Sequence, residues 1–592
     1  MVERTAWLSG DLLLLAGAGS EDDKRKIEGS VAAIGDRPLE VVTQVLAIPN
    51  GSGGETRLIA VSRFGRALNG STPGLTLTLG ESDTAISLDA TQRMESTAML
   101  REELTKLGPV WRKEALQFLW TAISPSLDRG GTFPLAQLLA EMNQEFRPHL
   151  PQLFRSRDDP YAAHVDIVLK LDERAVWVQG WMHDRENATA RLTVVAPEGA
   201  RAELLPGLFR HRRQDIQEMF HDKVGVKGDR HGYMCFAELD GPSHVSNGWV
   251  LELETLFEDH GERAIPPAEN DPMNARERIL PCLAFERPGS DDLMRHHVHP
   301  AMSRIQEGLR DAPSLDAVIQ FGEPPPAPTA SVIVPLYSKL WYLEYQMAEW
   351  AKDPELADAD LIYVLDTPEQ AVVLAEQAHG LHSIYGIPFR LAVMKGNAGF
   401  AGANNCAAGI ARADKLLLLN SDVVPDGTGW LGRMTAFYDA TPNIGALGAK
   451  LIYEDDSLQH AGIYFERSAE VPRVWEHMHY FKGQHRSLPA ANVARQVPAV
   501  TGACMMVARE LYEQMGGLSH RYIQGGYEDT DFCLRLTDEG REHWYIPGAE
   551  LYHLEAQSYP KGLRFHAERY NRWLHTELWN DRIERVMAQH AA

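Results

Sequence analysis

The stretch Lys415–Asp426, KLLLLNSDVVPD, decides the fold of the second half of this chain. Four consecutive leucines without polar alternation are typical of a strand that is covered on both faces, as in a parallel α/β sheet. The strand ends at Asn420-Ser421-Asp422, and Pro425 follows. Because open α/β sheets bind ligands beyond the carboxyl ends of their strands, Asp422 is placed for a metal or phosphate site. This stretch alone leaves open the alternative that Asp422 caps the next helix or turn.

Strands and helices alternate on both sides of this stretch. Strands are expected at Ser331–Tyr337, Leu361–Asp366 and Phe389–Met394, with helical patterns between them. The alternation predicts a parallel, doubly wound sheet from about residue 330 onward. Right-handed crossovers bring the ends of such strands to one edge, so Asp366 and Asp422 are expected near one another around a nucleotide.

A second group of acids follows a further buried strand at 500–507. Residues 525–532 read GGYEDTDF, which places Glu528, Asp529 and Asp531 within one helical turn. Clustered carboxylates raise one another's pKa and suit proton transfer, and acids in the first turn of a helix also stabilise its dipole. We interpret the cluster as serving both purposes. A last strand, at 544–553, ends in His553, which can ligate a metal or a phosphate.

Residues from about 330 to 560 resemble a family 2 glycosyltransferase domain of the GT-A fold. The resemblance is to the bacterial branch that builds surface polysaccharides, including rhamnosyltransferase-like members. It rests on seven motifs in order: SVIVPLY (331–337), VLD (364–366), NAGFAGANN (397–405), LLLLNSDVVP (416–425), TGACMMV (501–507), GGYEDTDFCLRL (525–536) and YHLEAQS (552–558). The residues before this region carry no motif that we can assign.

The resemblance implies a role for each matching residue. Asp422 and His553 would hold Mg²⁺ or Mn²⁺. Asp529 would be the catalytic base, with Glu528 and Asp531 shaping its environment. The nucleotide-sugar site would be formed by Pro335, Tyr337, Asp366, Asn397, Gly399, Asn404, Asn420 and Ser421.

The chain departs from the family pattern at two positions. The first acid of the D-x-D motif is replaced by Asn420, which removes a charge from the metal site. Many members carry an arginine where this chain has Asn404, which removes a diphosphate contact. Lys395 and Arg535 are the candidates to replace that contact.

The function implied by the resemblance is inverting, metal-dependent sugar transfer. The donor would be a nucleotide-diphosphate sugar, and the acceptor would be a hydroxyl of a glycan, a lipid-linked molecule or a protein. The setting would be the synthesis of bacterial cell-surface polysaccharide or glycoconjugate. The alternative is a catalytically silent sugar-binding or scaffolding protein that keeps the GT-A fold.

The first half of the chain is expected to be built from two β-rich, sandwich-like units with helical segments. The expected division is 1–95 (β-rich), 96–160 (helical, with a second helix near 134–146), 161–270 (β-rich), 271–329 (helical, ending in a proline-rich linker at 323–328) and 330–592 (catalytic). We expect Trp177, Trp181 and Trp249 to be core residues rather than a sugar-binding platform.

Composition limits the partners and the compartment. The 592 residues carry a net charge of −24, which argues against a nucleic-acid-binding protein. The five cysteines form no CxxC pair, so a reducing cytoplasm is expected. No stretch is long enough for a membrane span, so any membrane contact is expected to be peripheral, at the inner face of the cell membrane. The sequence leaves a homo-oligomer open.

Three remaining segments carry weaker signals. The histidines at 295–299 and at positions 477, 479 and 485 are expected to be solvated surface, because no carboxylates stand at ligand-like spacing. The stretch at 464–496 is either an acceptor loop or an ordinary surface excursion. The amphipathic segment at 560–592 is expected to pack on the catalytic domain rather than on a membrane.

Overall fold

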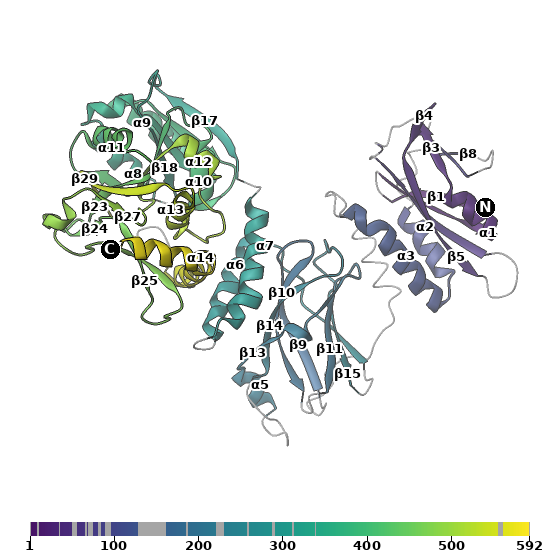
Figure 1. The fold of residues 1–592 in the computed structure, drawn as a ribbon. Coiled ribbons are helices and arrows are strands. Elements are labelled where there is room, and N and C mark those ends of the chain that lie inside the picture. The colour runs from purple at the N-terminus through teal and green to yellow at the C-terminus, as the bar shows by residue number, and fades with distance from the viewer. Residues whose placement is uncertain are drawn as a thin grey trace. The chain divides into compact units, whose positions relative to one another are not determined.

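A computed structural model describes residues 2–8, 11–34, 36–49, 56–65, 68, 75–80, 85–88, 96–127, 161–184, 188–220, 230–256, 260–286, 290–310, 313–337, 339–554 and 561–590. The chain divides into two compact units, Met1–Ala275 and Arg276–Ala592 (Figure 1). Each unit is described by itself. The helix expected near 134–146 lies outside the described residues.

The first β-rich part of the N-terminal unit contains two antiparallel sheets. One has the order β1 (Val2–Trp7), β2 (Leu12–Gly19), β6 (Thr56–Phe64), β5 (Val41–Pro49), and the other β4 (Arg37–Leu39), β3 (Val31–Ile34), β7 (Leu75–Thr78), β8 (Ala85–Ser87). Leu13, Leu58 and Leu77 belong to a core that draws on both sheets. Helices α2 (Ser96–Thr105) and α3 (Pro109–Leu127) join a second core with β2 and β6, and α1 (Glu21–Glu28) follows β2. The expected sandwich followed by helices is confirmed for the described residues.

The second β-rich part repeats this plan. Its sheets have the orders β13 (Phe209–His211), β14 (Gly232–Glu238), β10 (Ala175–Asp184), β9 (Tyr161–Lys170) and β12 (Arg201–Glu203), β11 (Thr189–Val195), β15 (Val250–Thr255), β16 (His260–Ala264). A short helix, α5 (Gln214–Met219), follows β13. Trp177 and Trp249 are fully buried and Trp181 is 5% exposed. The prediction that these tryptophans are core residues is confirmed.

The C-terminal unit is built on one large mixed sheet. Its order is β17 (Leu315–Phe321), β20 (Phe389–Met394), β19 (Asp360–Leu365), β18 (Ser331–Leu336), β21 (Lys415–Leu419), β28 (Cys504–Ala508), β23 (Ile444–Ile452), β29 (Glu542–His553), β22 (Val423–Pro425). β20, β19, β18 and β21 are parallel, as expected, but β17, β28 and β22 run antiparallel to their neighbours. β28 departs from the expected parallel order because it follows β23 through further strands rather than through a crossover helix. These further strands are β24 (Leu458–His460), β25 (Ile463–Arg467), β26 (Trp475–His479) and β27 (Arg495–Val497).

The proline-rich stretch at 323–328 lies inside this unit. It connects β17 to β18, and β17 pairs with β20 from Leu315 to Phe321. The stretch therefore joins two strands of one sheet. The expected division of the chain otherwise stays a prediction. The unit begins with α6 (Pro272–Ile279), which overlaps its boundary, and α7 (His299–Arg310).

Helices cover both faces of the sheet, which explains why its strands are apolar without alternation. Val332 and Val334 of β18 face one core, with α8 (Tyr342–Trp350), α9 (Ala371–Tyr385) and α11 (Trp430–Ala440). Ile333 faces the other core, with α10 (Gly399–Ala408), α12 (Arg509–Gln514), α13 (Glu528–Asp538) and α14 (Lys561–His590). The C-terminal helix α14 buries Ile583 and Val586 in that core, so the prediction that it packs on the catalytic domain is confirmed. None of the helices in the described ranges has the length and apolarity to cross a membrane.

A buried ion pair ties the parallel strands together. Arg390 of β20 contacts both carboxylate oxygens of Asp360 of β19 at 2.6 and 2.5 Å, and the hydroxyl of Ser331 of β18 donates to the same carboxylate at 2.7 Å. The side chains of Arg390 and Asp360 are 6% and 3% exposed. Removing one partner from such a pair leaves a buried charge without compensation.

We expect Arg390→Met to lower the free energy of unfolding of the C-terminal unit by about 3–5 kcal/mol. Urea unfolding followed by tryptophan fluorescence measures this change. The control is Lys352→Met, which removes an exposed pair with Glu349 and is expected to change stability by less than about 0.5 kcal/mol. Equal effects of the two substitutions would show that the Arg390 pair is not a stabilising contact.

Candidate active site

A cavity of about 320 Å³ opens at the carboxyl edge of the parallel strands. Its lining comes from the ends of β18, β19, β21 and β29, from the start of α13, and from the segment between β23 and β28. The lining residues are Pro335, Tyr337, Asp366, Gly399, Phe400, Asn420, Ser421, Asp422, Gln459, Ile463, His477, His479, Thr501, Gly502, Ala503, Gln524, Gly525, Gly526, Tyr527, Glu528, Asp529 and His553.

Most of the residues expected at the site line this cavity. They are Pro335, Tyr337, Asp366, Gly399, Asn420, Ser421, Asp422, Glu528, Asp529 and His553. The other three do not line it. The Asn397 amide donates to the backbone oxygen of Asp366, and Asn404 is fully buried with its amide on the Phe400 carbonyl. The Asp531 carboxylate accepts from Tyr522, Arg535 and Trp579, so it joins α13 to α14.

Asp366 lines the cavity at the end of β19, the strand end where the sequence placed it. The residue is 4% exposed, and its two carboxylate oxygens accept from the backbone N–H groups of Ala398 and Gly399 at 2.7 and 2.9 Å. Burial raises the pKa of Asp366 to about 7. This carboxyl group therefore holds the loop before α10 and keeps lone pairs for a ligand.

Asp422 and His553 meet because β22 pairs with β29. In that register Val423 lies opposite His553, and the N–H of Leu554 donates to the Asp422 carbonyl at 3.0 Å. Asp422 Oδ1 lies 3.4 Å from His553 Nε2. The buried amide of Gln346 donates to the carbonyls of Asn420 and Val423, which fixes the turn that carries Asp422.

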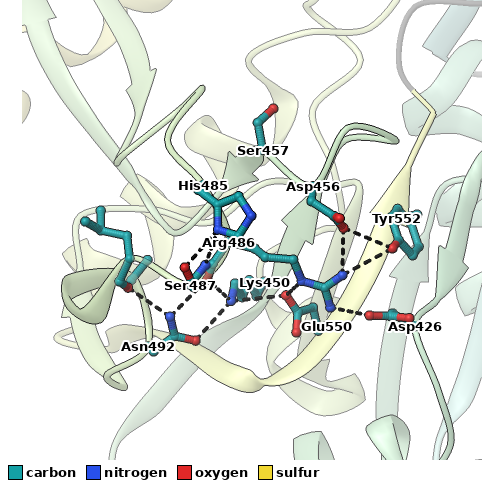
Figure 2. Close-up of polar contacts among 12 residues, drawn as sticks. Asp426, Lys450, Asp456, Ser457, His485, Arg486, Ser487, Asn492, Glu550 and Tyr552 are labelled. Atoms are coloured by element: carbon teal, nitrogen blue, oxygen red, sulfur yellow. Dashed lines mark hydrogen bonds and ion pairs between the residues drawn. The ribbon is translucent and has the colours of Figure 1, made fainter.

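Arg486 binds acidic residues on or next to both of these strands (Figure 2). It is not part of the cavity lining. Its guanidinium contacts Asp426, which follows β22, and donates to Glu550 of β29 at 2.9 Å and to Asp456 at 2.9 Å. Beneath it, the buried ammonium of Lys450 lies 3.1 Å from the same Glu550 oxygen. One cation thus joins the segment after β23 to the two strands that carry Asp422 and His553.

Asp529 is oriented by a close approach of two backbones. Its Oδ2 accepts from the N–H of Gly502 at 2.8 Å, and its Oδ1 accepts from the N–H of Thr530 at 2.8 Å. A Cβ atom on Gly502 would lie 3.3 Å from Asp529 Cβ and 3.5 Å from the Phe400 ring. Glycine therefore allows the N–H of residue 502 to reach the carboxylate.

The turn before α13 is conformationally unusual. Gln524, Gly525, Gly526 and Tyr527 all have positive φ, at 57°, 86°, 112° and 77°. Two of them are not glycine, and such residues cost roughly 1–3 kcal/mol each and cluster at functional sites. The turn delivers Glu528, which is 3% exposed, and burial raises the pKa of Glu528 to about 8. Glu528 is therefore protonated at neutral pH.

The sequence reading missed one wall of the cavity. Gln459, His477 and His479 line it, although the two histidines were expected to be solvated surface. That expectation is wrong for both histidines, because β25 pairs with the strand that carries them and α14 packs against that strand. It is also wrong for His297, which is 7% exposed. It is confirmed for His485, which is exposed. The H-x-H spacing within a strand, which puts both side chains on one face, was the available signal.

The charge of the lining is one-sided. It contains four carboxyl groups, those of Asp366, Asp422, Glu528 and Asp529, and no lysine or arginine among the described residues. Lys395 is outside it, and Arg535 binds Asp531 and two backbone carbonyls instead. A phosphate that enters this cavity needs a cation brought from solution to offset its charge.

A mixed sheet with a ligand cavity at the carboxyl ends of its parallel strands defines an α/β nucleotide-binding type of domain. Residues 325–576 match the profile of the "Glycosyltransferase like family 2" family. This part of the chain is a family 2 glycosyltransferase domain, and the GT-A fold expected from the motifs is confirmed.

Three curated relatives are similar to part of the chain. An uncharacterized protein of Sinorhizobium fredii is 30% identical over 39% of this chain and 25% of its own length. The O-antigen biosynthesis protein RfbC of Myxococcus xanthus is 29% identical over 26% of this chain and 12% of its own. An N-acetylglucosaminyl-diphospho-decaprenol L-rhamnosyltransferase of Mycobacterium tuberculosis is 30% identical over 23% of this chain and 46% of its own. The chain thus spans less than half the length of each relative.

Among solved structures, GalNAc-T7 with UDP, GalNAc and Mn²⁺ aligns with a TM-score of 0.34 and 14% identity. The alignment covers 43% of this chain and 49% of GalNAc-T7.

The raised pKa of Glu528 predicts a pH-dependent stability. The folded state keeps the proton up to about pH 8, whereas the unfolded state loses it near the ordinary glutamate pKa of 4.5, so rising pH between these values destabilises the wild type. Glu528→Gln removes this loss. Relative to the wild type, we expect the free energy of unfolding of the variant to rise by about 2–4 kcal/mol between pH 4.5 and pH 8. Above pH 8 the difference should stay constant.

Denaturant unfolding at several pH values, without added metal ions, measures the difference. The control is Glu376→Gln at an exposed position of α9. Wild-type and Glu528→Gln curves that stay parallel from pH 4.5 to 8 would contradict the assignment.

Proposed function

We propose that this chain transfers a sugar, with inversion and with the help of a divalent metal ion, from a nucleotide-diphosphate sugar to an acceptor hydroxyl. The observation that carries the proposal is the shared cavity. Asp422 and His553 meet on one side of it and the oriented carboxylate of Asp529 lies on another, in a lining whose described residues supply no cation.

The Asp422–His553 pair suits Mg²⁺ or Mn²⁺. The pair offers one carboxylate and one imidazole, and no group of three or more ligating side chains occurs in the described parts of the chain. Hard cations fill their remaining positions with waters and substrate phosphates. When bound, the metal would act as a Lewis acid that offsets the charge of the leaving diphosphate. Asn420 contributes no charge, so the donor's own phosphates complete the site.

Asp529 is the proposed base. Its carboxylate takes the proton of the acceptor hydroxyl while the hydroxyl oxygen bonds to the anomeric carbon and the bond from that carbon to the diphosphate breaks. The Gly502 N–H holds the carboxylate in a fixed orientation. Glu528, protonated below about pH 8, adds no second charge beside it.

The nucleotide end of the cavity is assigned to Asp366, Tyr337 and Pro335. The two loop N–H groups occupy one lone pair on each Asp366 oxygen, which leaves acceptors for a ribose hydroxyl or a base N–H. Gly399 and Asn420 line the same region, where a side chain and a bare backbone can approach the nucleotide.

The acceptor is proposed from the relatives alone. RfbC is an O-antigen biosynthesis protein, and the mycobacterial relative acts on a diphospho-decaprenol carrier, as their names state. We therefore place the chain in the synthesis of bacterial surface polysaccharide, with a glycan or lipid-linked acceptor. The alternative is a sugar-binding or scaffolding protein that keeps the fold. Release of nucleoside diphosphate from a panel of nucleotide sugars separates the two, because a silent protein releases none.

We expect Asp529→Asn to lower kcat by about 10²–10⁴-fold, the usual contribution of a general base. Binding of the nucleotide sugar should stay nearly unchanged, because the amide keeps the volume of the side chain. Steady-state kinetics and calorimetry measure the two effects. The matched control is Asp414→Asn, at an exposed position outside the cavity lining, and a wild-type kcat in Asp529→Asn would exclude Asp529 as the base.

Asp422→Ala is expected to weaken Mn²⁺-dependent binding of nucleoside diphosphate at least tenfold, since half of the protein's ligand pair is lost. Binding measured in EDTA should be the same in both proteins. Calorimetry with and without Mn²⁺ gives both numbers. If the Mn²⁺-dependent affinity is unchanged, Asp422 only caps the turn that follows β21.

A further inference from the structure

The cavity has a wall that the proposed reaction does not yet use. Gln459 of β24 and His477 and His479 of β26 face it. They come from the segment between β23 and β28, and α14 packs against β25 and β26 behind them. The wall is thus held by covered strands, which favours fixed side-chain positions.

Two polar atoms of this wall have no partner. Gln459 is 3% exposed, and neither its Oε1 atom nor His477 Nδ1 makes a hydrogen bond to any described residue. A buried polar atom left unpaired costs roughly 1–3 kcal/mol. The side chains that carry these atoms line the cavity, so a ligand that enters it with matching hydrogen-bonding groups is the available partner for them.

A neighbouring histidine, His460, holds neutral His479 in one tautomer. His460 is fully buried, and its Nε2 accepts from the N–H of Gly462 at 3.3 Å. The proton of neutral His460 is therefore on Nδ1, which lies 2.9 Å from His479 Nδ1 and donates to it. The proton of neutral His479 is then on Nε2, which has no partner among the described residues.

The wall lies between the two chemical ends of the site. The ring of His477 packs at a tilt of 30° against the ring of Tyr527, which directly precedes Glu528 and Asp529, with centroids 4.2 Å apart. His479 and His553 line the same cavity. In a single displacement the transferred sugar lies between the base and the leaving diphosphate, so its ring faces this wall.

The wall is also uncharged. Burial lowers the pKa of His460 to about 3 and lowers the pKa of His477 and of His479 as well. Gln459 is neutral at every pH. Neutral donors and acceptors match hydroxyl groups, whereas a carboxylate or phosphate on the sugar would lack a compensating cation here.

We infer that Gln459, His477 and His479 bind hydroxyl groups of an uncharged transferred sugar, and that His460 is a positioning residue that makes His479 a hydrogen-bond donor. This inference rests on the proposed function. It specifies which part of the donor these residues select, and it assigns Gln459, His477 and His479 of the segment between β23 and β28 to the donor sugar.

The test compares nucleoside diphosphates with their sugar esters in the full chain with Mn²⁺. The pairs are UDP and UDP-glucose, GDP and GDP-mannose, and dTDP and dTDP-rhamnose, measured by calorimetry. We expect Gln459→Leu and His479→Ala each to lower the affinity for the nucleotide sugar about 5- to 10-fold, which corresponds to the loss of one neutral hydrogen bond. The affinity for the nucleoside diphosphate should not change. The control is His379→Ala, at an exposed position of α9.

His460 is tested with two substitutions. His460→Leu removes the donor to His479 and is expected to lower nucleotide-sugar affinity as much as His479→Ala does. His460→Gln keeps an amide donor and is expected to recover part of the loss. If His460 were merely structural, its substitution would lower the affinities for the nucleoside diphosphate and for its sugar ester by the same factor.

Each outcome is decisive. A selective loss for the sugar ester in these variants supports the inference, and unchanged or equal losses for both ligands overturn it. Failure of the wild type to bind any of the three nucleoside diphosphates with Mn²⁺ overturns the proposed function, and the inference with it. The unaltered nucleoside diphosphate affinity also verifies that each variant is folded.

Discussion

The antiparallel pairing of β22 with β29 is the contact on which the site depends. β22 has three residues and lies at the edge of the sheet, and its partner β29 is the last strand along the chain. By placing Val423 opposite His553, the pairing puts the Asp422 carboxylate, from the turn between β21 and β22, beside the imidazole of His553 at the end of β29. A shift of this register by one residue would turn His553 to the other face of the sheet. The buried Gln346 amide and the Arg486 contacts both act on this same pairing.

Charge then divides the cavity into regions. Asp422 and Asp529 are its carboxylates, whereas the raised pKa values of Asp366 and Glu528 let these groups carry protons near neutral pH. The wall of Gln459, His477 and His479 is neutral. Under the proposed function, the anionic end would hold the metal ion and the diphosphate, and the neutral face would bind hydroxyl groups of the sugar. This division comes from burial, because it is burial that holds the three histidines of β24 and β26 uncharged.

Sequence reasoning reached the parts of the site that local pattern controls. A run of leucines followed by Asp422 marks a strand end, and the ends of parallel strands lie at one edge of the sheet. The placing of Asp366 and Asp422 in one cavity could therefore be foreseen. It could not reach what depends on long-range pairing. The antiparallel return of β28, and β17 as an edge strand before the proline-rich stretch, are set by partners distant in the chain. His477 and His479 looked like surface residues because the helix that covers them begins after residue 560. Asn404 and Asp531 carry polar side chains within the motifs, yet both are buried, and the hydrogen bonds they make are to other residues of the fold.

The Arg486 clamp limits how the segment between β23 and β28 can be exchanged among related enzymes. A single guanidinium serves Asp426, Asp456 and Glu550, which belong to three separate stretches of the chain. A transplanted segment without this arginine would leave Asp426 of the recipient without its cation and Glu550 with Lys450 alone. Grafting this segment to alter sugar choice therefore requires the recipient's β22 and β29 carboxylates to be exchanged with it, so the unit of substitution is larger than the loop itself.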